Sequence, residues 1–332
     1  MKCKPIAIRV LLIALSLFLM LPLTLGCGKQ EKDGKITVVC TVFPLYDWAR
    51  QICQFTDVEL ILLADNGTDL HSYQPTADDM IQIATCDLLL TVGGPSDAWV
   101  EEALRQHPSE DRQVCRMWDL EGITLRQISE ESLLCQEEDC SDTDHPHDHG
   151  GNEIDEHLWL SLKNAMIGCD AITSCLRELD SSNFEVYQKN LEDYLVHIRA
   201  LDQAYSEAAT ASENPAVLFA DRFPFVYLME DYGIRYGAAF RGCTTDADAD
   251  FDTILRLSSR VDEWGLSYVL TTENPVSGLA EQIRANTKNK NQTILAMNSL
   301  QSVTDKQLGE GITYIETMKQ NLETLRIVLT NQ

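Results

Sequence analysis

Two histidines stand in sequence contexts that could bind a metal ion. His71 lies within residues 67–79, Gly-Thr-Asp-Leu-His-Ser-Tyr-Gln-Pro-Thr-Ala-Asp-Asp, in a turn between an expected strand and an expected helix. His157 lies beside two carboxylates in residues 155–161, Asp-Glu-His-Leu-Trp-Leu-Ser. Imidazole is the commonest metal ligand in proteins. In a chain with only seven histidines, this arrangement favours metal binding.

A tract of alternating histidines runs directly before the second motif. His145, His147 and His149 lie in an acidic insert over residues 141–151, and we interpret them as auxiliary metal ligands. Ordering such a tract costs conformational entropy, so we expect it to bind a metal weakly. Binding would also depend on pH, because each imidazole must be neutral to coordinate. The alternative interpretation is a solvated acidic loop.

The N-terminus has the pattern of an exported lipoprotein. Three basic residues precede an apolar run over residues 10–25, which ends in Gly26 and Cys27. We therefore expect a signal peptide over residues 1–26, lipidation at Cys27 and a polar tether over residues 27–35. The alternative is a retained transmembrane anchor, but the run is near the lower limit of about 17 residues and contains a proline. The expected location is extracytoplasmic, with a lipid anchor in the cell membrane.

The net charge of the chain excludes one class of function. The formal net charge of −26 argues against nucleic-acid binding, because phosphate contacts need basic patches.

Of eleven cysteines, one leaves with the signal peptide and one would be lipidated, so an odd number remains and no complete disulfide framework follows. Cys135 with Cys140, or Cys169 with Cys175, could form a bridge. The six-residue spacing of the second pair also suits two buried thiols on one helix.

The chain alternates short apolar runs with amphipathic ones, which predicts an α/β fold with parallel sheets. In the N-terminal half we expect strands over residues 35–42, 58–63 and 87–92, with helices over residues 44–54 and 75–85. In the C-terminal half we expect strands over residues 216–220, 236–240, 268–272 and 293–297, with helices over residues 224–232, 250–263, 278–286 and 312–329. Ligands of such sheets collect beyond the carboxyl ends of the strands, where His71 is expected.

A long amphipathic pattern separates the two halves. It starts at an expected capping box from Ser182 to Glu185 and continues over residues 182–212, so one helix of about 45 Å could connect two lobes. We expect an N-terminal α/β lobe over residues 36–181 and a C-terminal α/β lobe over residues 213–332. The predicted fold is therefore two parallel-sheet lobes with flanking helices, joined by one long backbone helix. A small ligand would bind in the cleft between them.

The two histidine motifs and the insert occur in the order found in one group of transport proteins. From about residue 36 to the C-terminus, the chain resembles the zinc/manganese-specific solute-binding lipoproteins of bacterial ABC importers. That family carries Gly-x-Asp-Pro-His-x-Tyr-x-Pro-Thr and Asp-x-His-x-Trp-Leu motifs. The resemblance implies that His71 and His157 are the first two metal ligands.

The C-terminal lobe departs from the pattern of the family. Zinc binders of the family have a third histidine in a stretch like Phe-His-Asp-Ala-Phe, and Ala220 occupies that position here. The nearest donor is Asp221, which we take as the third ligand. The alternative is that Asp221 forms a salt bridge with Arg222.

The resemblance leaves the fourth ligand and the choice of metal open. For the fourth ligand we rank Glu273, at the end of an expected strand, first. Asn298, where manganese binders of the family place an aspartate, comes second, and water is a third option. Two imidazoles with a carboxylate suit zinc, while replacing histidine by carboxylate moves the preference towards manganese. The histidine tract favours zinc.

The expected function is capture of zinc, with manganese as the alternative, and its delivery to an ABC permease and its ATPase by a monomeric, non-enzymatic protein. A secreted zinc hydrolase is a weaker hypothesis, because the chain lacks His-Glu-x-x-His and an enzyme needs an open coordination position. A surface adhesin or metal-buffering lipoprotein is another. That third hypothesis predicts that deleting residues 142–151 abolishes metal binding, whereas the import hypothesis predicts that a tight site survives.

Overall fold

The computed structural model describes residues 35–64, 67–68, 70–129, 133, 153–242 and 249–330. The described residues from Ile36 onward form one compact unit. The expected lipidation site Cys27 and the histidines of residues 141–151 lie outside the described residues. Within the part that is described, no helix is both long enough and apolar enough to cross a membrane.

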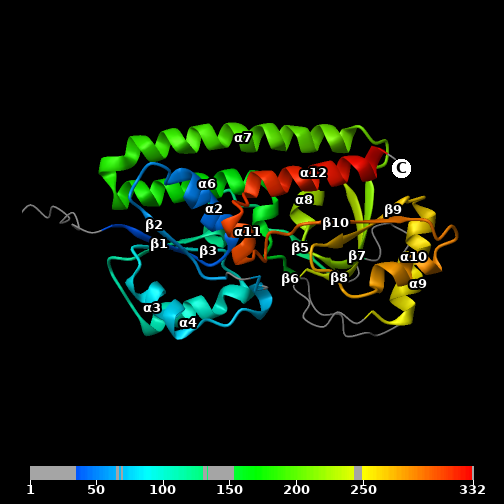
Figure 1. The fold of residues 1–332 in the computed structure, drawn as a ribbon, viewed down its shortest axis with the longest axis horizontal. Helices are drawn as coiled ribbons and strands as arrows, with labels where there is room; N and C mark the ends of the chain where they lie inside the picture. The colour runs from blue at the N-terminus through cyan, green and yellow to red at the C-terminus, as the bar shows by residue number, and fades with distance from the viewer. Residues whose placement is uncertain are drawn as a thin grey trace, which may run out of the picture. The chain divides into compact units, whose positions relative to one another are not determined.

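The N-terminal lobe is built on a parallel sheet with strand order β2-β1-β3-β4, of which β1, β2 and β3 are labelled in Figure 1. Its elements are β1 (Thr37–Cys40), α2 (Phe43–Ile52), β2 (Glu59–Leu62), α3 (Ala77–Thr85), β3 (Leu88–Thr91), α4 (Ala98–Gln106), β4 (Gln113–Arg116) and α6 (Leu162–Leu179). The two central strands, β1 and β3, are apolar on both faces. Val39 and Leu89 pack with side chains of α3 and α4, whereas Val38 and Leu90 belong to the large core that includes α2 and α6. Burial on both faces explains the continuous apolar runs of these strands.

The C-terminal lobe repeats this design with strand order β10-β9-β7-β8, again all parallel. Its elements are β7 (Ala216–Phe223), α8 (Val226–Asp231), β8 (Arg235–Arg241), α9 (Phe251–Glu263), β9 (Tyr268–Thr272), α10 (Leu279–Asn286), β10 (Thr293–Met297), α11 (Asp305–Gly309) and α12 (Tyr314–Thr330). One sheet face packs against α9 and α10 through Leu218 and Val269. The other contributes Val217 and Phe219 to the large core. The predicted fold of two parallel-sheet lobes is confirmed.

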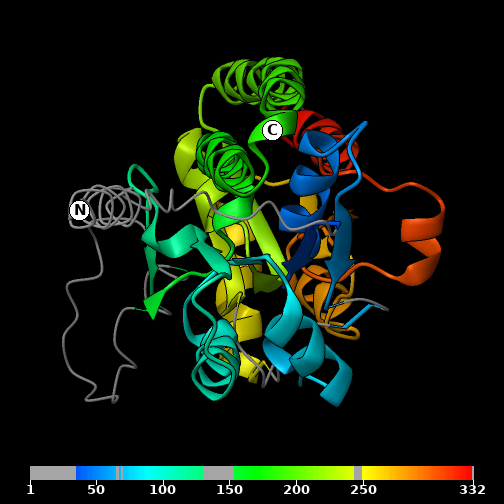
Figure 2. The same cartoon turned by 90° about the vertical axis from the view of Figure 1, so that its left-hand side faces the viewer.

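One helix, α7 (Phe184–Thr210), runs along both lobes and packs against α2, α6 and α12 (Figures 1 and 2). The predicted capping box at its start is wrong. Asn183 is the N-cap and its side chain makes no capping bond, while Asp180 caps the preceding turn, η5 (Ser181–Asn183). The hydroxyl of Ser182 donates to the carboxylate of Asp180 instead, so the earlier carboxylate is the acceptor at this helix start.

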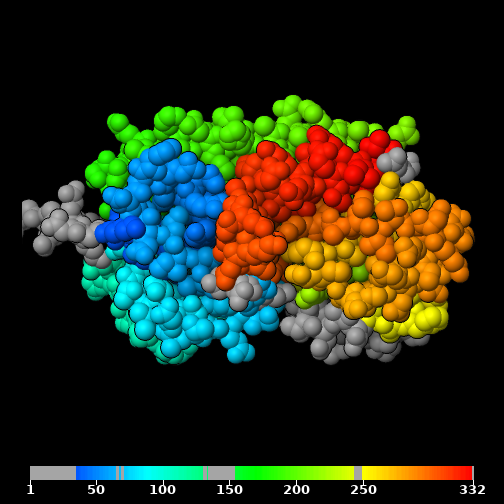
Figure 3. All heavy atoms as spheres, viewed as in Figure 1, coloured from blue at the N-terminus to red at the C-terminus, as the bar shows by residue number. Residues whose placement is uncertain are grey.

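The two lobes meet at the chain that follows β10. In the face shown in Figure 3, the segment around α11 lies against the N-terminal lobe. The backbone N–H of Gly67 donates to the carbonyl of Val303 at 2.9 Å, and the guanidinium of Arg50 donates to the carbonyl of Ile312 at 2.8 Å. Residues 299–303, called the 299–303 segment below, therefore belong to the C-terminal lobe and contact the N-terminal one.

The six cysteines among the described residues are free thiols. Cys169 and Cys175, one of the two pairs considered for a bridge, both lie on α6, and Cys169 is fully buried. The thiol that perturbs the pKa of Cys175 is that of Cys115 on β4. The thiol closest in its effect on Cys175 is thus on β4 and not on α6. The other pair considered, Cys135 and Cys140, lies outside the described residues.

Candidate metal-binding site

The imidazoles of His71 and His157 face each other edge to face, with ring centroids 5.3 Å apart. Their Nε2 atoms are 3.4 Å apart. Two nitrogens bound to one tetrahedral zinc at about 2.0–2.1 Å are themselves about 3.3–3.4 Å apart. His71 belongs to the short turn η1 (Leu70–Ser72), and His157 directly precedes η4 (Leu158–Leu160). The structure thus brings together the two histidines that the sequence motifs predicted.

The orientation of His157 is fixed by Asp155. Oδ1 of Asp155 is 2.9 Å from both the backbone nitrogen and the ring Nδ1 of His157, and both residues are buried. A proton on Nδ1, held by this carboxylate, makes Nε2 the nitrogen that would bind a metal ion, and Nε2 faces His71. Burial opposes the charged form of His157, but the carboxylate of Asp155, a hydrogen bond with Gln301 and the carboxylate of Glu156 outweigh it and raise the pKa of the imidazole.

A serine and a glutamate orient His71 in the same way. The ring Nδ1 of His71 is 2.7 Å from the hydroxyl of Ser96, which in turn donates to Glu156. The backbone N–H of Ser96 donates to the other oxygen of Glu156 at 2.6 Å. Burial raises the pKa of Glu156, and the bonds from Ser96 offset part of this rise. The Nδ1 atom of each histidine is therefore engaged by a supporting group, and the two Nε2 atoms face each other.

Local sequence signals explain where these two loops begin and end. Thr76 and Asp79 form a capping box that starts α3 and closes the loop of His71. Ser161 caps α6 and closes the loop of His157. Gly94, at φ +86°, lies where a Cβ would come within 2.7 Å of Glu156. Only glycine suits that position, because it needs both a left-handed backbone and space for the carboxylate.

Asp221, the predicted third ligand, is fully buried and bound by its own lobe. Its Oδ2 accepts hydrogen bonds from the backbone N–H and the hydroxyl of Thr272, at 2.9 and 2.7 Å. Its Oδ1 accepts from the backbone N–H groups of Arg222 and Val276, at 2.8 and 3.3 Å. These bonds tie the end of β7 to the loop after β9.

Glu273, the predicted fourth ligand, supports the 299–303 segment. Its two oxygens accept hydrogen bonds from the backbone N–H and the hydroxyl of Ser299, at 2.9 and 2.7 Å. Burial raises its pKa. Asn298, the second choice for this position, accepts from the backbone N–H of Leu300 at 2.8 Å. In the described ranges, no group of three or more His, Cys, Asp or Glu side chains is arranged to hold a metal ion. The predicted four-residue set is thus not brought together.

Gln301 is the residue of the C-terminal lobe that reaches the imidazoles. Its Oε1 is 2.8 Å from Nε2 of His157, and the residue is 8% exposed. No sequence motif marks Gln301 as a ligand. The available signal was its position, since it follows the last strand of a parallel sheet by four residues, at the edge where ligands collect.

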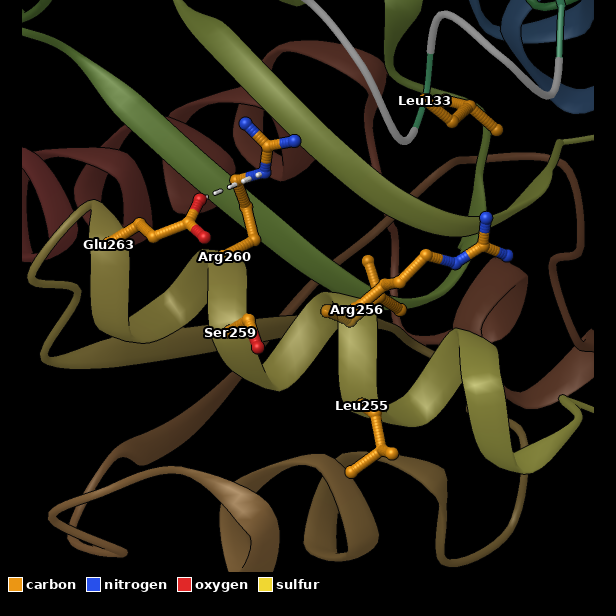
Figure 4. A pocket seen from close by; sticks show the side chains of 7 residues that line it. Leu133, Leu255, Arg256, Ser259, Arg260 and Glu263 are labelled. Atoms are coloured by element: carbon orange, nitrogen blue, oxygen red, sulfur yellow. Dashed lines mark ion pairs between the residues drawn. The ribbon is translucent and has the colours of Figure 1, made fainter. Parts of the chain in front are cut away.

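Two cavities elsewhere contain neither histidine. One, of about 260 Å³, lies between α9 and Leu133 (Figure 4). It contains the ion pair of Arg260 and Glu263, at 3.8 Å. The other, of about 430 Å³, lies beside the loop of His71 and includes Tyr73 in its lining. Neither cavity shares a residue with the imidazole pair.

Comparison with known sequences gives several relatives. The zinc-binding lipoprotein AdcA of Streptococcus pneumoniae is 29% identical over 305 residues, which are 91% of this chain and 57% of that protein. The chain thus spans little more than half the length of that relative. The high-affinity zinc uptake system protein ZnuA of Bacillus subtilis is 25% identical over 92% of this chain and 93% of its own length.

Solved structures share the fold. The Zn(II)-bound ZnuA-like domain of AdcA from Streptococcus pneumoniae matches with a TM-score of 0.70 at 24% identity, over 89% of this chain and 99% of that domain. A Mn-bound periplasmic metal-binding protein from Candidatus Liberibacter asiaticus matches with a TM-score of 0.70 at 20% identity, over 89% of this chain and 100% of that one. A family model described as zinc-uptake complex component A, periplasmic, matches residues 38–327. Because this match spans nearly the whole described unit, the chain belongs to the family of periplasmic zinc-uptake component A proteins.

Proposed function

We propose that this protein captures a zinc ion between its two lobes and delivers it to an ABC permease driven by a cytoplasmic ATPase. Manganese is the alternative cargo. The observation that carries the proposal is the 3.4 Å separation of the Nε2 atoms of His71 and His157. The family match and the zinc-related names of the relatives support zinc as the cargo.

The supporting groups suit a binding site for a divalent cation. Each histidine has its Nδ1 engaged by a hydrogen-bonding group that leads to a carboxylate, which is the usual arrangement around ligating histidines. Nitrogen donors of this kind fit zinc well. We propose binding and release rather than catalysis, since the residues around the pair orient the imidazoles.

The proposed location is extracytoplasmic, with the protein acting as a monomer anchored through a lipid on Cys27. The apolar run over residues 10–25 before Gly26 and Cys27 supports this, as does the lipoprotein name of the relative. We expect a Cys27→Ser variant to leave the membrane fraction. If it remains with the membrane like the unmodified protein, the anchor is not a lipid at this residue.

A competitive zinc titration against a calibrated chelator tests the binding proposal. It uses the soluble chain starting after Cys27 and compares His71→Ala and His157→Ala with matched controls. The controls are His107→Ala and His197→Ala, because both of these histidines are exposed and lie outside the pair. We expect the first two variants to lose affinity by orders of magnitude and the controls to bind normally. Wild-type zinc affinity in both His71→Ala and His157→Ala would refute the proposal.

Deletion of residues 142–151 separates the import proposal from a metal-buffering or adhesin role. One tight zinc site per chain should survive the deletion, because His71 and His157 lie outside the deleted tract. A preference for manganese in the same titration would identify the alternative cargo. Loss of all tight binding would move the protein to the buffering or adhesin class.

A further inference from the structure

We propose that the side-chain oxygen of Gln301 is the metal ligand supplied by the C-terminal lobe, which completes a site of two imidazoles and one neutral amide. This inference rests on the proposed function. Its Oε1 is 2.8 Å from Nε2 of His157, whereas the carboxylates of Asp221 and Glu273 are bound by Thr272 and Ser299. Gln301 thus takes the place for which a carboxylate was predicted from the sequence.

The contact with His157 involves the atom that a metal ion would use. Asp155 engages Nδ1 of His157, so Nε2 is the ring nitrogen that a metal ion would bind. An amide oxygen only accepts, so Oε1 of Gln301 accepts the N–H of Nε2 in the metal-free protein, and a metal ion on Nε2 would replace that proton. When a metal ion binds Nε2, the amide must therefore either coordinate the ion or withdraw.

The backbone around Gln301 favours coordination over withdrawal. The preceding residue, Leu300, is fully buried and has a φ of +61°, which is uncommon for a residue other than glycine. Asn298 accepts the N–H of Leu300, and Glu273 accepts both donors of Ser299. The two residues that the sequence offered as fourth ligands thus fix the turn that presents Gln301. A strained turn kept in one shape by its surroundings is typical of a functional position.

The same turn is fastened to both histidine loops. The indole N–H of Trp159 donates to the carbonyl of Ser299 at 2.8 Å, next to His157. The hydroxyl of Ser302 donates to the carbonyl of Gly67 at 2.7 Å, in the loop that leads to His71. The 299–303 segment therefore contacts both loops of the N-terminal lobe, and a metal bound by Gln301 would be contacted by both lobes.

A neutral amide ligand has a chemical consequence for the cargo. An amide oxygen adds a donor without adding negative charge, so the site attracts a divalent cation less strongly than one with a carboxylate. Carboxylate ligands also suit manganese better than imidazole does. We therefore expect Gln301→Glu to tighten binding and to raise the affinity for manganese relative to zinc.

The test is a competitive titration with zinc and with manganese on four soluble forms. These are the wild type, Gln301→Ala, Gln301→Glu and Gln203→Ala, in which an exposed glutamine of α7 serves as a matched control. Loss of a group next to the metal ligands costs about 10–100-fold in affinity, so Gln301→Ala should lose at least about tenfold. Gln301→Glu should bind more tightly than the wild type, and Gln203→Ala should bind like the wild type.

The sign of the effect decides between coordination and withdrawal. If Gln301 only occupies His157 and leaves when the metal binds, Gln301→Ala will bind zinc more tightly, which overturns the inference. Unchanged affinity overturns it as well. Thermal unfolding of the metal-free variants checks that any loss is not a folding defect. In the Co²⁺-loaded protein, Gln301→Glu should change the visible absorption bands, because they respond to the ligand set; unchanged bands count against coordination.

Failure of this inference is distinguishable from failure of the proposed function. If His71→Ala abolishes zinc binding while Gln301→Ala leaves zinc affinity unchanged, the interlobe zinc site is supported and the assignment of Gln301 as a ligand is wrong. If neither variant changes zinc affinity, the interlobe site itself is refuted.

Discussion

Oδ1 of Asp155 lies 2.9 Å from both the backbone nitrogen and the ring Nδ1 of His157, so one carboxylate oxygen fixes the loop and the tautomer together. We predict that Asp155→Asn weakens zinc binding by about 10–100-fold, the usual effect of removing a supporting group from a ligating histidine. Asp231→Asn is the matched control, because this carboxylate binds Ser161 and Arg126 and not an imidazole. Equal zinc affinity in the two variants would show that Asp155 does not support the site.

Gly242 lies directly against the ring of His157. A Cβ at this position would be 2.8 Å from Cε1 of His157 and 2.9 Å from the carbonyl of Phe223, which is closer than real Cβ contacts. We predict that Gly242→Ala displaces the imidazole, lowers zinc affinity and costs about 1–3 kcal/mol of stability, the usual cost of overpacking. Chelator competition and urea unfolding measure the two effects. Gly309→Ala should change neither, because nothing lies within 4 Å of a Cβ there.

The periodicity of the sequence was sufficient to predict the architecture. Runs such as β1 and β3 are apolar on both faces, because each face is covered by a different helical layer. The details of helix starts were less predictable. Ser182 resembles a cap in sequence, but Asp180 is the stronger acceptor and the chain turns around it first.

The candidate site was predictable only where a local motif carries it. His71 and His157 lie in such motifs, and the structure brings them together. Asp221 has the position of a ligand in sequence, but long-range hydrogen bonds from Thr272 engage it. The contact of Gln301 depends on the left-handed backbone of Leu300, for which a leucine gives no local signal.

We predict that Cys175 is the most reactive of the six described thiols. The hydrogen bond from Cys115 lowers the pKa of Cys175, whereas burial raises the pKa of Cys53 to about 12 and that of Cys86 to about 11. The thiolate is the reactive form, so Cys175 should react first with iodoacetamide at a pH of about 7.5. Peptide mapping after brief labelling identifies the site. Faster labelling of Cys53 or Cys86 would contradict the prediction.

Asp221 should matter for stability and not for the metal. In Asp221→Ala the buried N–H and hydroxyl of Thr272 lose their acceptor, so we predict a loss of about 1–3 kcal/mol in the free energy of unfolding of the metal-free protein. The zinc affinity of the folded fraction should stay close to that of the wild type. His71→Ala should show the opposite pattern, with weak zinc binding and a smaller change in stability, because its ring is at the candidate site. Urea unfolding without metal and chelator competition give both quantities for each variant. If folded Asp221→Ala loses zinc affinity by orders of magnitude, the carboxylate is the ligand from the C-terminal lobe and the assignment of Gln301 is wrong.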